Sequence, residues 1–235
     1  MSPSHRVIVA LDFDSASAAA RLVDQLGASA PFYKIGLQLL TAEGPSVVRD
    51  LIAAGKQVFL DLKLLEIPNS VAGAVVAAGK LGVSLVTVHA CGGSAVLRAA
   101  VEAARPFPQL KVLALTVITS LRDGDLPEVG VNATVEEQVV RLAKLATAAG
   151  CHGVVASPRE AALLRGILPR DTLIVTPGTQ LPGDARNDQA RIATPAQAIR
   201  AGSTHLVIGR SITHSPDPAA AFAAVCREVE EAVAQ

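Results

Sequence analysis

The sequence predicts a (β/α)8 barrel, in which eight parallel strands close into a cylinder and the connecting helices form an outer layer. Three observations support this prediction. A short apolar run, a polar loop and a helix-like segment recur eight times, the runs show little polar alternation, and the 235 residues suit one such barrel. The chain contains no linker or low-complexity tract, so we expect residues 1–235 to form a single domain.

An open, doubly wound sheet also alternates strands with helices and is the main alternative fold. Such a sheet would carry a glycine-rich turn after its first strand, where a dinucleotide binds. The corresponding segment here, LDFDSAS at residues 11–17, contains no glycine. The strand count, the chain length and the missing turn together favour the closed barrel.

Each expected strand is a short apolar run that ends beside a polar residue or a glycine. The expected strands are Arg6–Asp12, Phe32–Leu37, Gln57–Lys63, Leu85–Ala90, Lys111–Thr119, Gly153–Ala156, Thr172–Thr176 and His205–Gly209. Runs that are apolar on both faces are typical of parallel strands covered by helices.

The expected helices are recognised by the residues that begin and end them. A capping serine or threonine, an acid three positions later or a first-turn proline marks the start, and glycine often marks the end. The expected helices are one from about Ser15 to Leu26, one between Pro45 and Gly55, one from Pro68 to before Gly82, one from Ser94 to before Pro106, one from Thr134, one capped by Ser157 with Pro158 and Glu160 in its first turn, one from Thr194 and Pro195, and one from Asp217 and Pro218.

Composition excludes several classes of partner. Lysine plus arginine and aspartate plus glutamate each number 21, so no excess of positive charge attracts nucleic acid or an anionic membrane. Cys91, Cys151 and Cys226 are odd in number and lack metal-ligand spacing, which indicates reduced thiols. The start MSPSHR has no signal-peptide pattern, and no apolar run reaches the roughly 18 residues of a membrane span. We expect a cytoplasmic protein without a metal site.

The stretch QVFLDLKLLEIPNS at residues 57–70 begins as a buried strand and ends in charged residues. Side chains alternate along a strand, so Asp61 and Lys63 point the same way, and Glu66 follows on the loop. In a barrel, chemistry belongs at the carboxyl ends of the strands. Polar residues and glycines fall at these ends, namely Asp12, Lys34, Asp61, Lys63, His89, Thr119, Ser157, Gly178, Gly209 and Arg210.

The last two strand ends have the composition of a phosphate site. They read TPGTQ and VIGRS, where glycine allows close approach and Arg210 can pair with an anion. In this fold the last two loops frequently bind phosphate through backbone N–H groups. The sequence therefore predicts a small phosphorylated ligand.

The segments VALDFD, YKIG, VFLDLKxxxIPN, VHACGG, LTVITS, TPG, NDQARIATP and LVIGR, in this order and spacing, resemble the orotidine 5'-phosphate decarboxylases. The resemblance covers nearly the whole chain. It implies decarboxylation of orotidine 5'-phosphate to UMP, the last step of de novo uridylate synthesis, without a metal or an organic cofactor. It also implies a homodimer, in which Glu66 and the residues after it reach the neighbouring subunit's site.

The resemblance implies roles for individual residues as well. Lys34, Asp61, Lys63 and Glu66 would form an alternating charge network, with Lys63 as the proton donor to C6 of the pyrimidine. The implied substrate-binding residues are Asp12 and Lys34 at the ribose hydroxyls, Asp61 near the departing carboxylate, Ser70 beyond Glu66, Thr119 at the pyrimidine edge, and Gln180, Gln189, Gly209 and Arg210 toward the phosphate.

The chemistry of such a site can be argued without the family. Loss of CO2 from C6 leaves a carbanion that no carbonyl delocalises, so the barrier must fall through electrostatics and positioning. An ammonium at C6 stabilises the carbanion and then protonates it. Opposite charges about 4 Å apart attract by about 4 kcal/mol at an effective dielectric near 20, so fixed neighbours keep Lys63 charged and aimed. Asp61 either repels the substrate carboxylate or orients Lys63.

Two positions depart from the family pattern. Glu66 stands where members usually have Asp, and one extra methylene moves a carboxylate by about an ångström, which costs around a hundredfold in a preorganised site. Gln180 stands where bacterial members usually have Arg. Glutamine brings no charge, so phosphate binding is expected to depend more on Arg210.

Other interpretations stay open at this stage. Asp61 and Lys63 are also suited to a structural ion pair, and Thr119 and Gln189 to loop caps. A metal-dependent sugar-phosphate decarboxylase of the same superfamily would need an acid where Lys34 stands. A non-catalytic UMP-binding protein would bind UMP without turnover. An aldolase with Lys63 as a Schiff-base amine would need a neutral amine beside Asp61.

Overall fold

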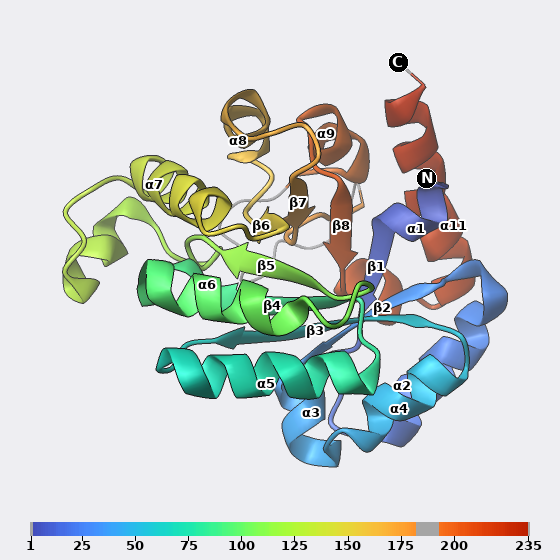
Figure 1. The fold of residues 1–235 in the computed structure, drawn as a ribbon. Helices are drawn as coiled ribbons and strands as arrows, with labels where there is room; N and C mark the ends of the chain where they lie inside the picture. The colour runs from blue at the N-terminus through green and yellow to red at the C-terminus, as the bar shows by residue number, and fades with distance from the viewer. Residues whose placement is uncertain (1, 182–192, 235) are drawn as a thin grey trace.

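A computed structural model describes residues 2–181 and 193–234. Its strands form a closed barrel in the order β1-β2-β3-β4-β5-β6-β7-β8, and β8 pairs with β1. Every pairing is parallel. The helices surround the barrel on the outside (Figure 1). The predicted (β/α)8 fold is confirmed.

The strands occupy the apolar runs expected from the sequence. They are β1 (Val7–Ala10), β2 (Phe32–Gly36), β3 (Gln57–Leu64), β4 (Leu85–His89), β5 (Lys111–Leu115), β6 (Gly153–Val155), β7 (Leu173–Thr176) and β8 (His205–Ile208). The α-helices are α1 (Pro3–Arg6), α2 (Ala16–Leu26), α3 (Leu37–Glu43), α4 (Ser46–Ala53), α5 (Pro68–Leu81), α6 (Gly93–Ala104), α7 (Val135–Ala148), α8 (Ala161–Ile167), α9 (Pro195–Arg200), α10 (Arg210–Thr213) and α11 (Pro218–Val233).

Several helix starts follow the capping signals in the sequence. Thr134 and Thr194 each accept a hydrogen bond from the backbone three residues later, and the side chain at that position bonds back to the cap. Asp217 accepts from the Ala220 backbone ahead of α11. These local bonds satisfy backbone N–H groups in the first turn of each helix.

Some expected boundaries are wrong. The fifth strand ends at Leu115 rather than Thr119, and α3, which the sequence did not predict, lies between β2 and the helix after Pro45. The helix expected to be capped by Ser157 begins at Ala161, with Glu160 as its N-cap. The buried Ser157 hydroxyl donates to the Glu160 carboxylate, so it does not cap the helix backbone.

The core has two layers separated by the strands. An inner cluster fills the barrel with Ile8, Phe32, Phe59, Leu85, Leu113, Leu115, Val155 and Val175. The outer layer lies between strands and helices and contains most other buried apolar residues. In β3, Phe59 belongs to the inner cluster and Leu60 to the outer layer, which confirms the expected alternation.

Candidate active site

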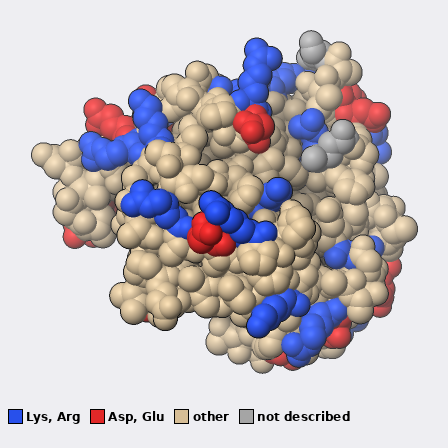
Figure 2. Space-filling model, in the orientation of Figure 1, with Lys and Arg blue, Asp and Glu red and all other residues tan. Residues whose placement is uncertain are grey.

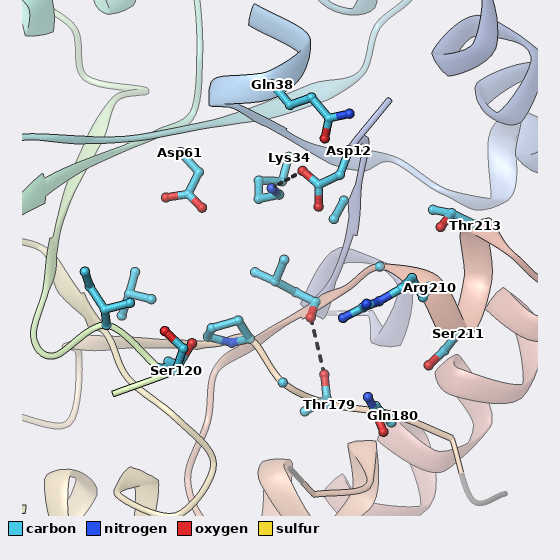
Figure 3. Close-up of a pocket in the computed structure, with 18 of the residues that line it drawn as sticks. Asp12, Lys34, Gln38, Asp61, Ser120, Thr179, Gln180, Arg210, Ser211 and Thr213 are labelled. Atoms are coloured by element: carbon cyan, nitrogen blue, oxygen red, sulfur yellow. Dashed lines mark hydrogen bonds and ion pairs between the residues drawn. The ribbon is translucent and has the colours of Figure 1, made fainter. Parts of the chain in front are cut away.

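A cavity of about 580 Å³ opens at the carboxyl ends of the strands (Figure 3). Its size suits a small molecule such as a nucleotide. Strand ends or following loops of β1, β2, β3, β5, β6, β7 and β8 contribute to its wall. The cavity therefore occupies the face of the barrel where the sequence placed the polar residues.

Most of the residues singled out from the sequence line this cavity. Those that do are Asp12, Lys34, Asp61, Lys63, Thr119, Gly178, Gln180, Gly209 and Arg210. Glu66 and Ser70 are not among the lining residues. Gln189 lies outside the described residues.

Two ion pairs form one side of the cavity. Lys34 Nζ lies 2.7 Å from Asp12 Oδ1, and Lys63 Nζ lies 2.8 Å from Asp61 Oδ2. The Lys34 side chain is only 10% exposed, whereas that of Asp12 is 54% exposed. Buried Lys34 is thus held by a carboxylate that also faces the open cavity.

Gly36 makes room for the first ion pair. A Cβ atom added at this position would lie 2.9 Å from Lys34 Nζ and 3.3 Å from Asp12 Oδ1. Gly36 lies two residues after Lys34 on β2, so a side chain at Gly36 would point to the same side of the strand as Lys34. The absence of a side chain at Gly36 is therefore part of the geometry of the site.

The end of β3 is irregular where it carries the second ion pair. Its pairing with β4 runs from Leu60 opposite Val86 to Leu64 opposite Val88, so β3 has two more residues than β4 in this interval. Lys63 has a φ of 50° and is the only non-glycine residue with positive φ among the described residues. Strained backbone of this kind concentrates at functional sites.

Thr87 on β4 contacts both Asp61 and Lys63. Nothing in the sequence pointed to this role. Its hydroxyl donates to Asp61 Oδ1 at 2.9 Å and accepts from the Lys63 backbone N–H at 2.9 Å. Thr87 is fully buried. A threonine inside the run LVTVH resembles any strand residue, so only the register of the two strands reveals its role.

The opposite side of the cavity is formed by the loops after β7 and β8. Figure 3 places Gln180, Arg210 and Ser211 across the cavity from Asp61. The Thr179 hydroxyl donates to the Val207 carbonyl at 3.4 Å and connects the loop after β7 to strand β8. Further lining residues that the sequence analysis did not select include Gln38, Ser120, Thr179, Ser211, Thr213 and His214.

None of residues 65–70, in the loop after β3 and the start of α5, lines the cavity. A hydrogen bond from Ser70, and then one from the Ile67 backbone, lower the pKa of Glu66, which is fully exposed to solvent. Leu65 and Ile67 on either side are 55% and 62% exposed. Within one chain, Glu66 belongs to neither described ion pair at the cavity, and the resemblance assigns it to the neighbouring subunit's site, so its place in the charge network stays a prediction.

His89 at the end of β4 lies close to the second ion pair. Burial lowers its pKa, the positive charge of Lys63 lowers it further, and the negative charge of Asp61 partly opposes this decrease. Its Nδ1 lies 3.5 Å from Cys91 Sγ. The lowered pKa favours the neutral imidazole, which adds no further positive charge beside Lys63.

The described parts of the chain contain no candidate metal centre and no candidate membrane span. No group of three or more His, Cys, Asp or Glu side chains in residues 2–181 and 193–234 is arranged to hold a metal ion. No described helix combines the length and apolar character that crossing a membrane requires. Positive and negative side chains are intermixed on the face shown in Figure 2.

A closed parallel barrel with paired charges at the carboxyl ends of its strands defines an enzyme of the (β/α)8 class. The sequence model of the "Orotidine 5'-phosphate decarboxylase / HUMPS family" matches residues 5–225. The chain therefore belongs to this family of carboxy-lyases and related enzymes, and the resemblance seen in the sequence is confirmed.

Individual relatives agree with this assignment. The chain is 47% identical to an orotidine 5'-phosphate decarboxylase of Moorella thermoacetica, over 98% of this chain and 94% of the relative. It is also 47% identical to one of Anaeromyxobacter dehalogenans, with coverage of 96% and 98%. The crystal structure of the Lactobacillus acidophilus decarboxylase matches with a TM-score of 0.86 and 37% identity, over 95% of this chain and 98% of that one.

Proposed function

We propose that this protein decarboxylates orotidine 5'-phosphate to UMP and CO2 in pyrimidine biosynthesis. The observation that carries the proposal is the Lys63–Asp61 pair, 2.8 Å apart at the wall of the cavity. Family membership supports the same reaction. The proposed chemistry needs only side chains of the protein and no cofactor.

In the proposed reaction, Lys63 stabilises the carbanion that forms when CO2 leaves C6. An ammonium beside the developing charge lowers the barrier and then supplies the proton to C6. Asp61 keeps the ammonium aimed, because its Oδ2 accepts from Lys63 Nζ. The charges are in place before the reaction begins, so little reorganisation is needed at the transition state.

The rest of the cavity is proposed to hold the substrate at its sugar and phosphate ends. Asp12 and Lys34 are suited to the ribose hydroxyls, because they offer a half-exposed acceptor and an ammonium donor side by side. Thr119 lies at the proposed pyrimidine edge. The phosphate is proposed to bind near Gly209, Arg210 and Gln180. Binding energy from the phosphate end can be expressed in the transition state at C6.

The direct test is the absorbance decay of orotidine 5'-phosphate with purified protein in EDTA. Turnover is expected to survive the chelator. Lys63→Ala should abolish turnover but retain UMP binding, measured by calorimetry, because the proposed phosphate contacts are untouched. An active Lys63→Ala variant would remove the proton-donor role, and UMP binding without wild-type turnover would indicate a binding protein.

We further propose a homodimer in which Glu66 and Ser70 act at the neighbouring subunit's site. Support comes from the loop itself, where Glu66 faces solvent between exposed Leu65 and Ile67. Apolar side chains that flank a charged residue on an exposed loop suit a subunit interface. We also propose that the whole chain forms one domain and works in the cytoplasm, where its free cysteines would stay reduced.

Mixing two inactive variants tests the shared site. Lys63→Ala and Glu66→Ala chains are each expected to lose activity alone. In a mixed dimer, one site combines the intact Lys63 of one chain with the intact Glu66 of the other. Activity should recover to about a quarter of wild type, since about half of the dimers are mixed and each has one complete site. No recovery after verified subunit exchange would contradict the proposal.

A further inference from the structure

We propose that Thr87 is a positioning residue that sets the orientation of both charged groups at the reacting end of the site. The inference rests on the proposed decarboxylation, because it assigns the task of Thr87 through Asp61 and Lys63. Thr87 is not among the residues that line the cavity. It therefore acts through its neighbours and does not touch the substrate itself.

The first observation is the mismatch between β3 and β4. Leu60 on β3 pairs with Val86 on β4, and Leu64 pairs with Val88. Four steps along β3 therefore correspond to two steps along β4. Thr87 is the single residue of β4 in this interval. In a regular parallel ladder, backbone N–H groups bond to carbonyls of the next strand. Here the Lys63 N–H donates to the Thr87 hydroxyl at 2.9 Å instead.

The second observation is the conformation that this bond supports. Lys63 has a φ of 50°, in the left-handed region that side-chain-bearing residues avoid. Such a conformation persists only where surrounding contacts determine it. The hydroxyl of a fully buried residue on the adjacent strand is a contact of this kind. Thr87 therefore helps to fix the backbone from which the Lys63 ammonium projects.

The third observation concerns the carboxylate of Asp61. Its Oδ1 accepts from the Thr87 hydroxyl at 2.9 Å, and its Oδ2 accepts from Lys63 Nζ at 2.8 Å. With one oxygen held from the buried side, the other is directed at the ammonium. The Thr87 hydroxyl thus bridges the Lys63 backbone and the partner of the Lys63 side chain.

Threonine is suited to this position by its shape. Its branched Cβ restricts the side chain to few rotamers, so the hydroxyl direction is defined with little entropy cost. Valine has nearly the same shape but cannot donate or accept a hydrogen bond. Thr87→Val therefore removes the bridge, whereas Thr87→Ser retains the hydroxyl and should rescue it.

The test compares Thr87→Val and Thr87→Ser with a matched control, Thr176→Val. Thr176 is also fully buried, and its hydroxyl is hydrogen-bonded to Ser203 rather than to Asp61 or Lys63. For Thr87→Val we expect kcat for orotidine 5'-phosphate to fall about tenfold to a hundredfold, as expected for a small misplacement of catalytic groups. KM and UMP affinity should change by less than about threefold, because no phosphate or ribose contact is lost. Thr87→Ser and Thr176→Val should keep kcat near wild type.

A second measurement reports on the environment of the Lys63 ammonium without requiring turnover. The 15N resonance of Lys63 Nζ, assigned with Lys63→Ala, should shift or broaden in Thr87→Val and stay in place in Thr176→Val and Thr87→Ser. If Thr87→Val does not fold, Thr87→Ala replaces it, because it removes the hydroxyl without adding a methyl group toward Asp61.

The outcomes separate this inference from the proposed function. An active wild type with unchanged kcat and unchanged Lys63 resonance in Thr87→Val would overturn the positioning role while leaving the decarboxylase intact. An equal loss of kcat in Thr87→Val and Thr176→Val would also overturn it, because the effect would then be structural. A wild type without turnover would refute the decarboxylase, and the resonance would still decide whether Thr87 orients Lys63.

Discussion

Replacing Gly36 with alanine tests how closely the ion pair at the sugar end is fitted to its surroundings. The added Cβ would lie 2.9 Å from Lys34 Nζ, whereas ordinary van der Waals contacts begin at 3.4 Å. The ammonium must therefore move, and a shift of about 0.5 Å restores ordinary contact. Gly36 has a φ of −100°, which alanine readily adopts, so no backbone strain is added.

The expected effect is on activity and not on stability. Lys34 Nζ is the end of a flexible side chain and can yield at small cost, so the melting temperature should change by less than about 3 °C. A misplacement of about 1 Å in a catalytic site costs around a hundredfold, so half that displacement should lower kcat/KM about tenfold. A tenfold loss corresponds to about 1.4 kcal/mol of transition-state stabilisation.

The assay is the initial rate of absorbance decay over a range of orotidine 5'-phosphate concentrations. Gly166→Ala is the matched control, because a Cβ at that position on α8 meets no atom within 4 Å. The control should keep full activity and gain slight stability from the better helix former. Unchanged kcat/KM in Gly36→Ala would refute the idea that activity depends on the exact position of Lys34, since the lysine would then have moved without a loss of activity.

Three further predictions concern other parts of the molecule. Arg210→Ala should weaken UMP binding about tenfold to a hundredfold, as expected for a lost charge-assisted hydrogen bond, with little effect on uridine in calorimetry. Glu66→Asp should leave turnover unchanged or raise it, because it restores the acid usual in the family. Burial, and then the charge of Arg6, lower the pKa of His205 to about 4. The unfolded chain then binds a proton that the folded chain excludes, so the free energy of unfolding should fall by about 3 kcal/mol from pH 6.5 to 4.

Each of these predictions has an outcome that contradicts it. Equal losses of UMP and uridine affinity would remove the phosphate role of Arg210. A large drop in turnover for Glu66→Asp would show that the loop is adapted to glutamate. Chemical denaturation at several pH values measures the third effect, and His205→Gln should flatten the dependence below pH 6.5. A variant with the same slope as wild type would show that other groups cause it.

The sequence predicted the fold well because each repeat carries its own signals. Apolar runs and capping residues are local, and the closed barrel follows from counting them. The errors occur where a tertiary contact outweighs a local signal. Ser157 has the spacing of a helix cap, yet its hydroxyl bonds to buried Glu160. The segment after Lys111 continues as an apolar run, but the strand ends at Leu115.

The charged side of the site was predictable because strand alternation determines which residues share a face. Asp61 and Lys63 are two positions apart on β3, and Lys34 lies on the neighbouring strand β2. The supporting contacts were not predictable in the same way. The register shift opposite Thr87 and the positive φ of Lys63 depend on how two strands meet, and Gly36 matters only because two side chains converge above it.

The floor of the cavity restricts how this enzyme can change its substrate. Leu115 and Val155 line the cavity and also belong to the inner cluster that fills the barrel. A mutation that deepens the pocket at either position also leaves a void in the packing below, which costs free energy of folding. Acceptance of larger ligands is therefore more readily evolved at the rim loops, where substitutions leave the barrel filling intact.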